Sequence, residues 1–278
     1  MSTLRKPEKI ARTAYIIAEF RAEENAGPDP LYRDDVVPLF LDAETREMAR
    51  LSAATFPAAS EMVKVRTWYF DRAMTRALSA GATQAVILGA GLDTRAVRLA
   101  REGARFFEID DALTLRLKQD GLAAAGMRPD VAWIPGDYLA DGLIDLLRGT
   151  GCDLDRPTHV LWEGNTTYLE PADVRSVLGV LAGAFRDLDL SFDFMSEKVI
   201  TRTTGYADLD AYIDHLTSIG APWRSGFDDI ESVAADAGLT LVESFSASEL
   251  FRRCRGLETA PSPIFDHYFV CTMRSAGI

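Results

Sequence analysis

The stretch from Ala85 to Asp111, AVILGAGLDTRAVRLAREGARFFEIDD, constrains the fold more than any other part of this chain. A short apolar run ends in a Gly-Ala-Gly turn at residues 89–91, a helical pattern begins near Leu92, and a second apolar run at residues 106–109 ends in acids. This alternation predicts a strand, a glycine turn, a helix and a second strand. Such a unit is typical of the nucleotide-binding half of an open α/β sheet.

The turn and the second strand suit a ligand that contains a ribose. Gly89 and Gly91 lack a Cβ atom, so they can adopt positive φ and let a ligand approach the backbone closely. The helix that follows would point free N–H groups at the turn. Asp110 follows the second strand, where an acid accepts both hydroxyls of a ribose in related sheets.

The turn is not a dinucleotide-binding fingerprint, because Thr94 stands where the third glycine of G-x-G-x-x-G would be. A dinucleotide places its pyrophosphate at the helix N-terminus, and the Asp93 carboxylate would repel it there. Asp93 is compatible with a ligand that carries a cation, or it simply caps the helix. These features disfavour an NAD(P)-dependent oxidoreductase, which stays as an alternative.

Length, composition and charge exclude several classes of protein. The 278 residues, 47% hydrophobic and 26% charged, predict one large α/β domain with an extension. The net charge is −12 and there is no basic run, which argues against nucleic acids and anionic membranes as partners. No apolar run approaches the roughly 18 residues that span a bilayer, and the N-terminus lacks the apolar core of a signal peptide.

The few cysteines and histidines suggest no special chemistry. The three cysteines are widely spaced and odd in number, which predicts free thiols in a reducing cytoplasm. The three histidines are scattered, so no metal site is predicted. We expect His159, inside an apolar run, to be a core or edge histidine that faces a neighbouring helix.

The residues that precede the glycine turn are predicted to be helical. Residues 7–25 and 60–78 carry apolar stripes at helical spacing, and residues 31–56 suggest short helices and loops. We expect residues 1–80 to fold over the ligand edge of the sheet as a helical lid. Residues 81–278 would then form the sheet core of a single domain that spans residues 1–278.

Arg66 is the one cation on the apolar stripe of the helix at residues 60–78. It lies four residues after Met62 and three before Tyr69, on a face that should be buried. A buried cation needs a partner. Arg66 therefore either snorkels to the edge of the stripe or reaches the ligand pocket and binds a carboxylate there.

The rest of the chain alternates further strands and helices. The predicted helix at residues 112–125 would bury Leu113, Leu117 and Ala124. Residues 196–207 should form a mobile loop, and the last two strands an antiparallel hairpin. Further strands are predicted at residues 131–134, 158–162, 188–195, 239–245 and 267–273, and further helices at residues 139–147, 171–186, 208–219 and 228–238, the last capped by Asp228.

Acids also follow two further predicted strands. Asp137 and Tyr138 come after the strand at residues 131–134, and Glu163 comes directly after the strand at residues 158–162, with Tyr168 just beyond. Open α/β sheets bind ligands at the carboxyl ends of their strands. Glu163 therefore either contributes to the ligand site or only pairs with an arginine.

Five segments together resemble the leucine carboxyl methyltransferase family. They are V-R-T-W-Y-F-D at 65–71, V-I-L-G-A-G-L-D-T-R at 86–95, F-F-E-I-D at 106–110, G-D-Y at 136–138 and W-E-G-N-T-T-Y-L at 162–169. The bacterial branch looks most similar, including the polyketide O-methyltransferases of the tetracenomycin type. The resemblance implies a Rossmann-like class I methyltransferase fold, α/β, with a seven-stranded mostly parallel sheet and helices on both faces.

The resemblance implies S-adenosyl-L-methionine (SAM) as cofactor. Arg66 would hold its carboxylate, Glu163 would lie near its amino group, Asp110 would accept the ribose hydroxyls, and Asp137 and Tyr138 would flank the adenine. The predicted cofactor-binding set is Arg66, Gly89, Ala90, Gly91, Asp110, Asp111, Asp137, Tyr138 and Glu163.

One departure from the family bears on the acceptor. The protein phosphatase methyltransferases of the family have an arginine shortly after the adenine-side acid, whereas here Asp137 is followed by Tyr138-Leu139-Ala140. This disfavours a phosphatase tail as acceptor and favours a small molecule that is methylated at a carboxylate or hydroxyl oxygen. No residue is clearly a catalytic base; Tyr168, Tyr15 and Tyr32 are candidates to orient the acceptor. The alternative is a SAM-binding protein that does not transfer the methyl group.

Overall fold

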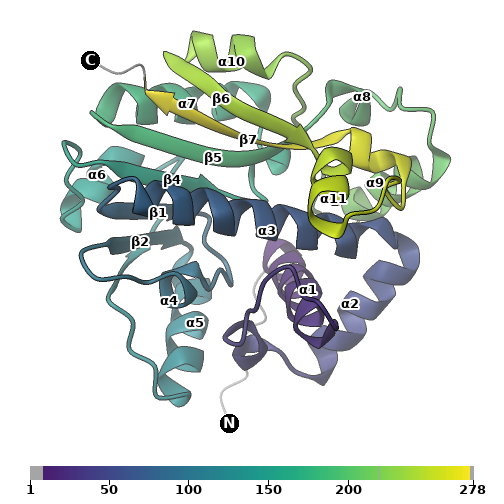
Figure 1. Ribbon diagram of the computed structural model, residues 1–278, viewed down its shortest axis with the longest axis horizontal. Helices are drawn as coiled ribbons and strands as arrows, with labels where there is room; N and C mark the ends of the chain where they lie inside the picture. The colour runs from purple at the N-terminus through teal and green to yellow at the C-terminus, as the bar shows by residue number, and fades with distance from the viewer. Residues whose placement is uncertain (1–8, 219, 276–278) are drawn as a thin grey trace.

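The computed structural model describes residues 9–218 and 220–275 and contains one seven-stranded sheet (Figure 1). The strand order is β3-β2-β1-β4-β5-β7-β6, in which β1 to β5 are parallel and β7 is antiparallel to both neighbours. This confirms the predicted seven-stranded, mostly parallel sheet. The strands are β1 (Gln84–Leu88), β2 (Arg105–Asp110), β3 (Val131–Pro135), β4 (Thr158–Trp162), β5 (Leu188–Met195), β6 (Leu239–Ser246) and β7 (Tyr268–Ser275).

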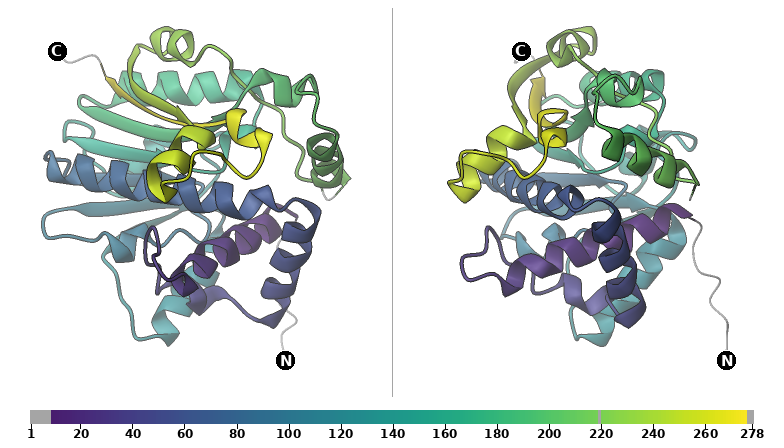
Figure 2. Two further views of the ribbon diagram at one scale, coloured as in Figure 1. Left: turned by 45° about the vertical axis from the view of Figure 1, so that its right-hand side comes forward. Right: turned by 90° about the vertical axis from the view of Figure 1, so that its right-hand side faces the viewer.

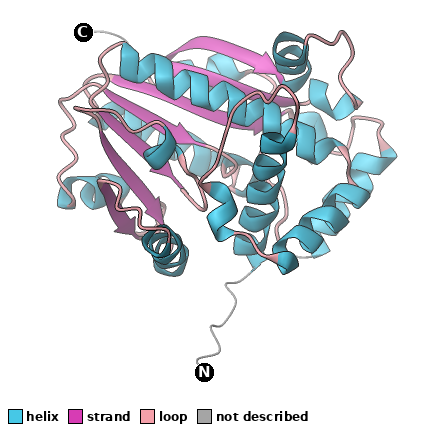
Figure 3. Ribbon diagram, turned by 60° about the horizontal axis from the view of Figure 1, so that its bottom comes forward, coloured by secondary structure: helices cyan, strands magenta, loops and turns pink. Residues whose placement is uncertain are grey.

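Helices cover both faces of the sheet, as Figure 3 shows. The α-helices are α1 (Lys9–Glu23), α2 (Ala43–Thr55), α3 (Ala58–Ser79), α4 (Arg95–Arg98), α5 (Ala112–Ala124), α6 (Leu143–Gly149), α7 (Pro171–Ala184), α8 (Glu197–Ile200), α9 (Ala207–Ser218), α10 (Ile230–Asp236) and α11 (Ala247–Arg255). Short 3-10 helices occur at η1 (Glu24–Ala26), η2 (Val37–Phe40), η3 (Thr166–Tyr168) and η4 (Pro263–Asp266).

Alternation along the central strand divides the core into two layers. Ala85 and Ile87 of β1 pack with α3 and α11, while Val86 and Leu88 pack with α6, α7 and α10 on the opposite face. All five residues of β1 are buried, because helices cover both sides of a parallel strand. The apolar run that looked like a strand in the sequence is therefore the centre of the sheet.

The chain order of the sheet reverses between β1 and β4. β1 is hydrogen-bonded to β2 on one side and to β4 on the other. At such a point the connections leave in opposite directions, and a crevice opens at the carboxyl ends of the strands. Helix α1 contacts α2, α3 and η2, and the views in Figure 2 place these N-terminal helices together on one side of the sheet.

Several predicted helices begin or end elsewhere. The helix predicted near Leu92 is only the four-residue α4, which begins at Arg95. The helix predicted from Leu139 begins at Leu143, because a turn in which Asp141 accepts a hydrogen bond from Asp137 N comes first. Asp229 rather than Asp228 caps α10, whereas Asp228 accepts a hydrogen bond from Glu197 N.

The closing strands and α5 also differ from the prediction. β6 and β7 are antiparallel, but α11 and η4 separate them, so they are not a tight hairpin. The predicted loop at residues 196–207 contains the short helix α8. The buried side of α5 is Thr114, Leu115, Lys118 and Leu122 rather than the predicted residues, because Lys118 forms a buried ion pair with Glu108 of β2.

His159 is fully buried, but its partner is not on a helix. Its Nδ1 lies 2.8 Å from Asp189 Oδ1 on the adjacent strand β5, at the paired register position. The expectation of a core histidine is confirmed, and the expectation that it faces a helix is wrong.

Candidate functional site

A cavity of about 1070 Å³ lies at the carboxyl ends of the central strands and is bordered by α1 and α3. Every residue of the predicted cofactor set lines it, and so does Tyr168. Thus residues from five separate sequence segments are brought to one site: Arg66, Gly89, Ala90, Gly91, Asp110, Asp111, Asp137, Tyr138, Glu163 and Tyr168. Tyr15 and Tyr32 do not line this cavity.

The glycine turn forms the floor of the cavity. Gly89 has φ +59° and Gly91 has φ +46°, so both require the left-handed region that glycine adopts freely. A Cβ on Gly89 would lie 2.2 Å from Asn165 Oδ1. Asn165 Nδ2 donates to the carbonyls of Leu88 and Gly89, each at 3.3 Å. Asn165 therefore fixes the turn, a contact that the sequence did not reveal.

Asp110 lies beside the turn at the end of β2. Its Oδ2 accepts a hydrogen bond from Gly91 N at 2.6 Å, and its Oδ1 accepts one from Asp111 N at 2.7 Å. Burial raises the pKa of Asp110 to about 6, because these two hydrogen bonds do not fully offset the loss of water around the carboxylate. Asp111 caps α5 by accepting from Leu113 N and Thr114 N.

The β3 side of the cavity combines an exposed acid with an aromatic ring. Asp137 is exposed and accepts a hydrogen bond from Leu139 N. Tyr138 packs edge-on against Trp162, and its hydroxyl accepts from Trp162 Nε1 at 3.1 Å. Burial raises the pKa of Tyr138 to about 12, so it is a neutral phenol.

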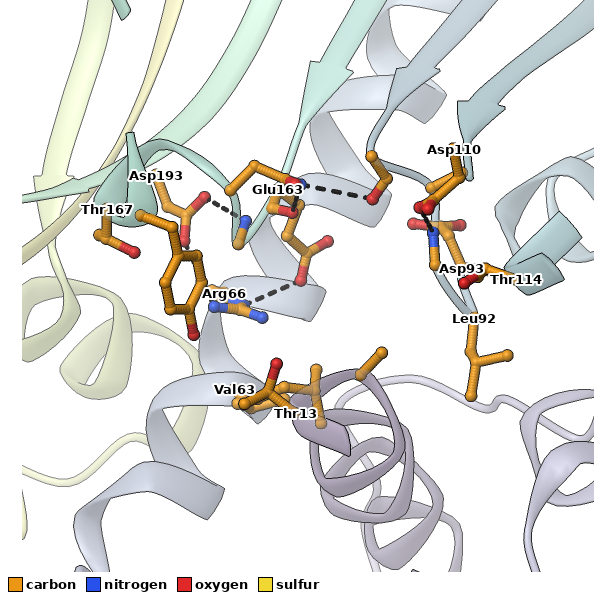
Figure 4. Close-up of a pocket in the computed structure, with 18 of the residues that line it drawn as sticks. Thr13, Val63, Arg66, Leu92, Asp93, Asp110, Thr114, Glu163, Thr167 and Asp193 are labelled. Carbon is orange, nitrogen blue, oxygen red and sulfur yellow. Dashed lines mark hydrogen bonds and ion pairs between the residues drawn. The ribbon is translucent and has the colours of Figure 1, made fainter. Parts of the chain in front are cut away.

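Arg66 lies on the β4 and β5 side of the cavity (Figure 4). It is 8% exposed, which rules out the snorkelling alternative. Its Nε donates to Glu163 Oε1 at 2.9 Å, and its Nη1 donates to Tyr268 Oη at 2.9 Å and to Asp193 Oδ2 at 3.3 Å. Among the described residues, none accepts a hydrogen bond from Nη2.

Arg95 forms the second cationic centre next to the cavity. Its Nη1 donates to Glu163 Oε2 at 2.6 Å and also contacts Asp93 Oδ2, and its Nε donates to Asp71 Oδ1 at 2.7 Å. Burial alone would raise the pKa of Asp93, but Arg95, with help from Arg21, lowers it to about 2. Asp93 Oδ1 also accepts a hydrogen bond from Arg95 N at 2.7 Å, so its side chain satisfies the N–H group at the start of α4, and both of its oxygens are paired with Arg95.

Two charged residues of this region were missed by sequence reasoning. Asp193 is 1% exposed, accepts from Gly164 N at 2.6 Å and binds Arg66. Its signal was an acid inside the apolar strand at residues 188–195, where an unpaired charge is costly. Arg95 stood within the quoted glycine-turn segment and carried no sign that its side chain would turn inward.

Aromatic side chains border another part of the cavity. Phe56 and Tyr212 stack with ring centroids 4.5 Å apart, and Trp223 packs edge-on against Tyr212 at 5.7 Å. All three line the cavity with Tyr168. Burial raises the pKa of the Tyr168 hydroxyl, which makes it a hydrogen-bonding group rather than a base.

The described residues include neither a metal-binding cluster nor a membrane-spanning helix. No three histidine, cysteine or acidic side chains of residues 9–218 and 220–275 are grouped so that they would hold a metal ion. Within the same residues, no helix has the length and apolar character needed to cross a bilayer.

The fold is shared with solved structures. A DUF574-family protein from Streptomyces avermitilis superposes with a TM-score of 0.65 and 17% identity, covering 95% of this chain and 97% of that one. A predicted methyltransferase from Thermobifida fusca superposes with a TM-score of 0.62 and 18% identity, covering 99% and 97%. At this identity the likeness concerns the fold, and it confirms the Rossmann-like class I methyltransferase architecture.

Sequence comparison gives closer relatives. A predicted SAM-dependent methyltransferase from Mycolicibacterium paratuberculosis is 36% identical over 187 residues, which are 62% of this chain and 59% of the relative. Another from Frankia alni is 33% identical over 196 residues, covering 64% of this chain and 67% of the relative. The match thus spans about three fifths of the first relative's length. The sequence pattern of leucine carboxyl methyltransferases matches residues 14–182, and the chain therefore belongs to the leucine carboxyl methyltransferase family.

Proposed function

We propose that this protein transfers a methyl group from SAM to an oxygen atom of a small-molecule acceptor. The observation that carries the proposal is the arrangement of charge around the cavity. Asp110 lies at one end, Arg66 and Glu163 lie at the other, and the glycine turn lies between them. SAM carries ribose hydroxyls at one end and a carboxylate and an ammonium at the other, so its groups and these residues are complementary.

The residues present fit the cofactor at specific atoms. Arg66 Nη2 has no partner among the described residues and would bind the methionine carboxylate. Asp110 would accept the ribose hydroxyls, and Glu163 would face the ammonium. Backbone of the turn at residues 89–91 would pack against the cofactor, with Asp111, Asp137 and Tyr138 around the adenine.

The protein's part in the reaction would be to bind, align and exclude water. When bound, SAM would supply a methyl group on a sulfonium; a carboxylate, or a hydroxyl that gives up its proton, would form the new C–O bond as the C–S bond breaks and the thioether leaves. Because this displacement is in line, holding the acceptor at the correct angle is the main catalytic requirement. Helix α1, which lines the cavity through Thr13, Ala14 and Ile17, would serve within the proposed lid at residues 1–80, while α3 stays packed on a face of the sheet core of this single domain.

The acceptor would occupy the aromatic part of the cavity. Ligand pockets of about 300–1,000 Å³ take one drug-sized molecule, so a cavity of about 1070 Å³ suits a cofactor together with a small acceptor. The aromatic and apolar lining favours a polyketide-like compound over a phosphatase tail, and Tyr168 is our candidate to orient it.

The thiols of Cys152 and Cys271 are buried and unpaired, in keeping with a reducing cytoplasm.

Incubation of the purified protein with SAM and a panel of phenolic and carboxylic acceptors, followed by mass spectrometry, tests the proposal. The expected product is an acceptor heavier by one CH₂ group, accompanied by the demethylated cofactor. A product made from SAM alone would instead support cleavage or cyclisation of the cofactor. Binding of NADH without binding of SAM would reject the proposal altogether.

A further inference from the structure

A continuous chain of buried ion pairs connects the N-terminal segment with the Arg66 end of the cavity. Asp34 is fully buried and lies 3.5 Å from Arg98 Nε. Arg98 Nη1 binds Asp71 Oδ2 at 2.7 Å, and Asp71 Oδ1 accepts from Arg95 Nε at 2.7 Å. Arg95 then binds Glu163, the residue that binds Arg66. Arg95 is the middle of this chain and is 1% exposed.

Stability alone does not explain so much buried charge. Ionised groups are costly to remove from water, and apolar replacements of buried ion pairs are often neutral or stabilising. The pairs around Arg95 also have a specific geometry, since one guanidinium contacts three carboxylates from three elements: Asp71 of α3, Asp93 of the glycine turn and Glu163 after β4. This geometry sets where the Glu163 carboxylate can lie.

The two carboxylate oxygens of Glu163 bind two different arginines. Oε1 is 2.9 Å from Arg66 Nε, while Oε2 is 2.6 Å from Arg95 Nη1. A carboxylate beside a guanidinium tends to form two parallel hydrogen bonds to it. If Oε2 were released from Arg95, it would be free to bind Nη2 of Arg66, which adjoins Nε on the guanidinium edge. That donor is the one that has no partner among the described residues.

We propose that Arg95 is a positioning residue: by holding Oε2 of Glu163, it keeps Nη2 of Arg66 available for the carboxylate of an amino-acid ligand. This inference rests on the proposed function, since that ligand would be the methionine end of SAM. Arg95 contacts no ligand in this arrangement and acts only through Glu163 and Arg66. Its effect is therefore confined to the half of the cofactor that those two residues would bind.

The test compares SAM with 5′-methylthioadenosine, which keeps the adenosine and lacks the amino-acid group. Calorimetric titration should show that Arg95→Lys weakens SAM binding about 10- to 100-fold, the loss expected for one charge-assisted hydrogen bond. The Kd of 5′-methylthioadenosine should stay within about twofold. Lysine keeps the positive charge but can bind fewer carboxylates at once, so the comparison isolates the effect of the guanidinium geometry.

A second variant and a control separate positioning from general loosening. Asp71→Asn acts on Arg95 from the side away from Glu163, and it should weaken SAM binding by a smaller factor while sparing 5′-methylthioadenosine. This variant decides the matter if Arg95→Lys does not fold. Glu24→Gln removes a part-buried ion pair with Arg255 that does not belong to this chain of ion pairs; it should leave both affinities unchanged.

If Arg95→Lys and Asp71→Asn lowered the affinities for both ligands equally, the positioning role would be overturned. Unchanged SAM affinity in folded variants would overturn it too. Failure of the wild-type protein to bind SAM would instead overturn the proposed function. The two failures are therefore distinguishable in one set of titrations.

Discussion

The two ends of the cavity hold their acids in opposite ways. At the end formed by β2 and β3, Asp110 and Asp111 accept hydrogen bonds mainly from backbone N–H groups, which lie within three residues of them except for Gly91 N in the glycine turn. At the end formed by β4 and β5, Glu163 and Asp193 bind arginines that are far away in the sequence. The first end depends on local turns, and the second depends on the packing of several elements around buried charge.

This difference teaches where ligand binding and stability should separate. A carboxylate held by backbone N–H groups can be neutralised without leaving an opposite charge behind. A carboxylate held by a buried arginine cannot, because loss of either partner leaves an uncompensated charge in the interior. We therefore expect changes at the β4 and β5 end to lower both the stability and the affinity for SAM, and changes at the β2 and β3 end to lower ligand affinity without loss of stability.

The largest effect is expected for Arg66→Met. It removes the cation that faces Glu163 and Asp193, so stability should fall by about 3–5 kcal/mol and SAM affinity by about 100-fold or more. Binding of 5′-methylthioadenosine should fall far less. Thermal unfolding and calorimetric titration measure the two effects. Arg72→Met, at an exposed position of the same helix, is the control; equal losses for both ligands would contradict the assignment of the two ends.

Asp110→Asn should weaken the binding of both SAM and 5′-methylthioadenosine, because both ligands contain the ribose. We expect about a 10- to 100-fold rise in Kd for SAM and for 5′-methylthioadenosine alike. Stability should not fall, since burial already penalises the ionised form of Asp110. Asp120→Asn, at an exposed position of α5, serves as the control. A variant that loses stability but retains both affinities would reverse the comparison.

The pH dependence of ligand binding should identify the role of Asp110 without any substitution. The pKa of Asp110 is raised to about 6 by burial, whereas that of Asp93 is lowered to about 2. Ribose binding uses the ionised Asp110, so affinity for 5′-methylthioadenosine should fall about tenfold between pH 7.5 and pH 5. The contribution of Asp110 to stability has the opposite sign and grows as pH falls through about 6.

Titration of Asp110→Asn over the same pH range checks that assignment. The variant has no carboxyl group at this position, so its weaker binding should be independent of pH. A pH dependence that persists in Asp110→Asn would show that another group is responsible.

The smallest effect is expected for Gly164→Ala. Gly164 has φ +72°, and a Cβ there would lie 3.2 Å from Arg66 Nη2. Gly103 has φ +81° with no atom within 4 Å of such a Cβ. Both alanine variants should lose about 1–2 kcal/mol of stability. Only Gly164→Ala should also weaken the binding of SAM, by a few-fold. Identical SAM affinities for the two variants would argue against a ligand at Arg66 Nη2.

The sequence determined the sheet and its ligand edge. The strands at residues 158–162 and 188–195 have the predicted bounds, because continuous apolar runs flanked by polar residues and turns are a local signal. The glycine turn was equally local, since positive φ at residues 89 and 91 depends on the residue type itself. Periodicity gave the approximate extent of α3 and α5, although it gave the wrong buried side for α5.

Tertiary structure alone decided how the charges are shared. No local pattern indicates that Arg95 turns inward, that Glu163 divides its oxygens between two arginines, or that Asp193 lies beside Arg66. Partners so far apart in sequence meet only when α3, the glycine turn, β4 and β5 pack together. The energy of each pair depends on burial and on the remaining partners, so it exists only in the folded protein. Residue types thus fixed what this site can bind, and packing fixed which of its donors is left open.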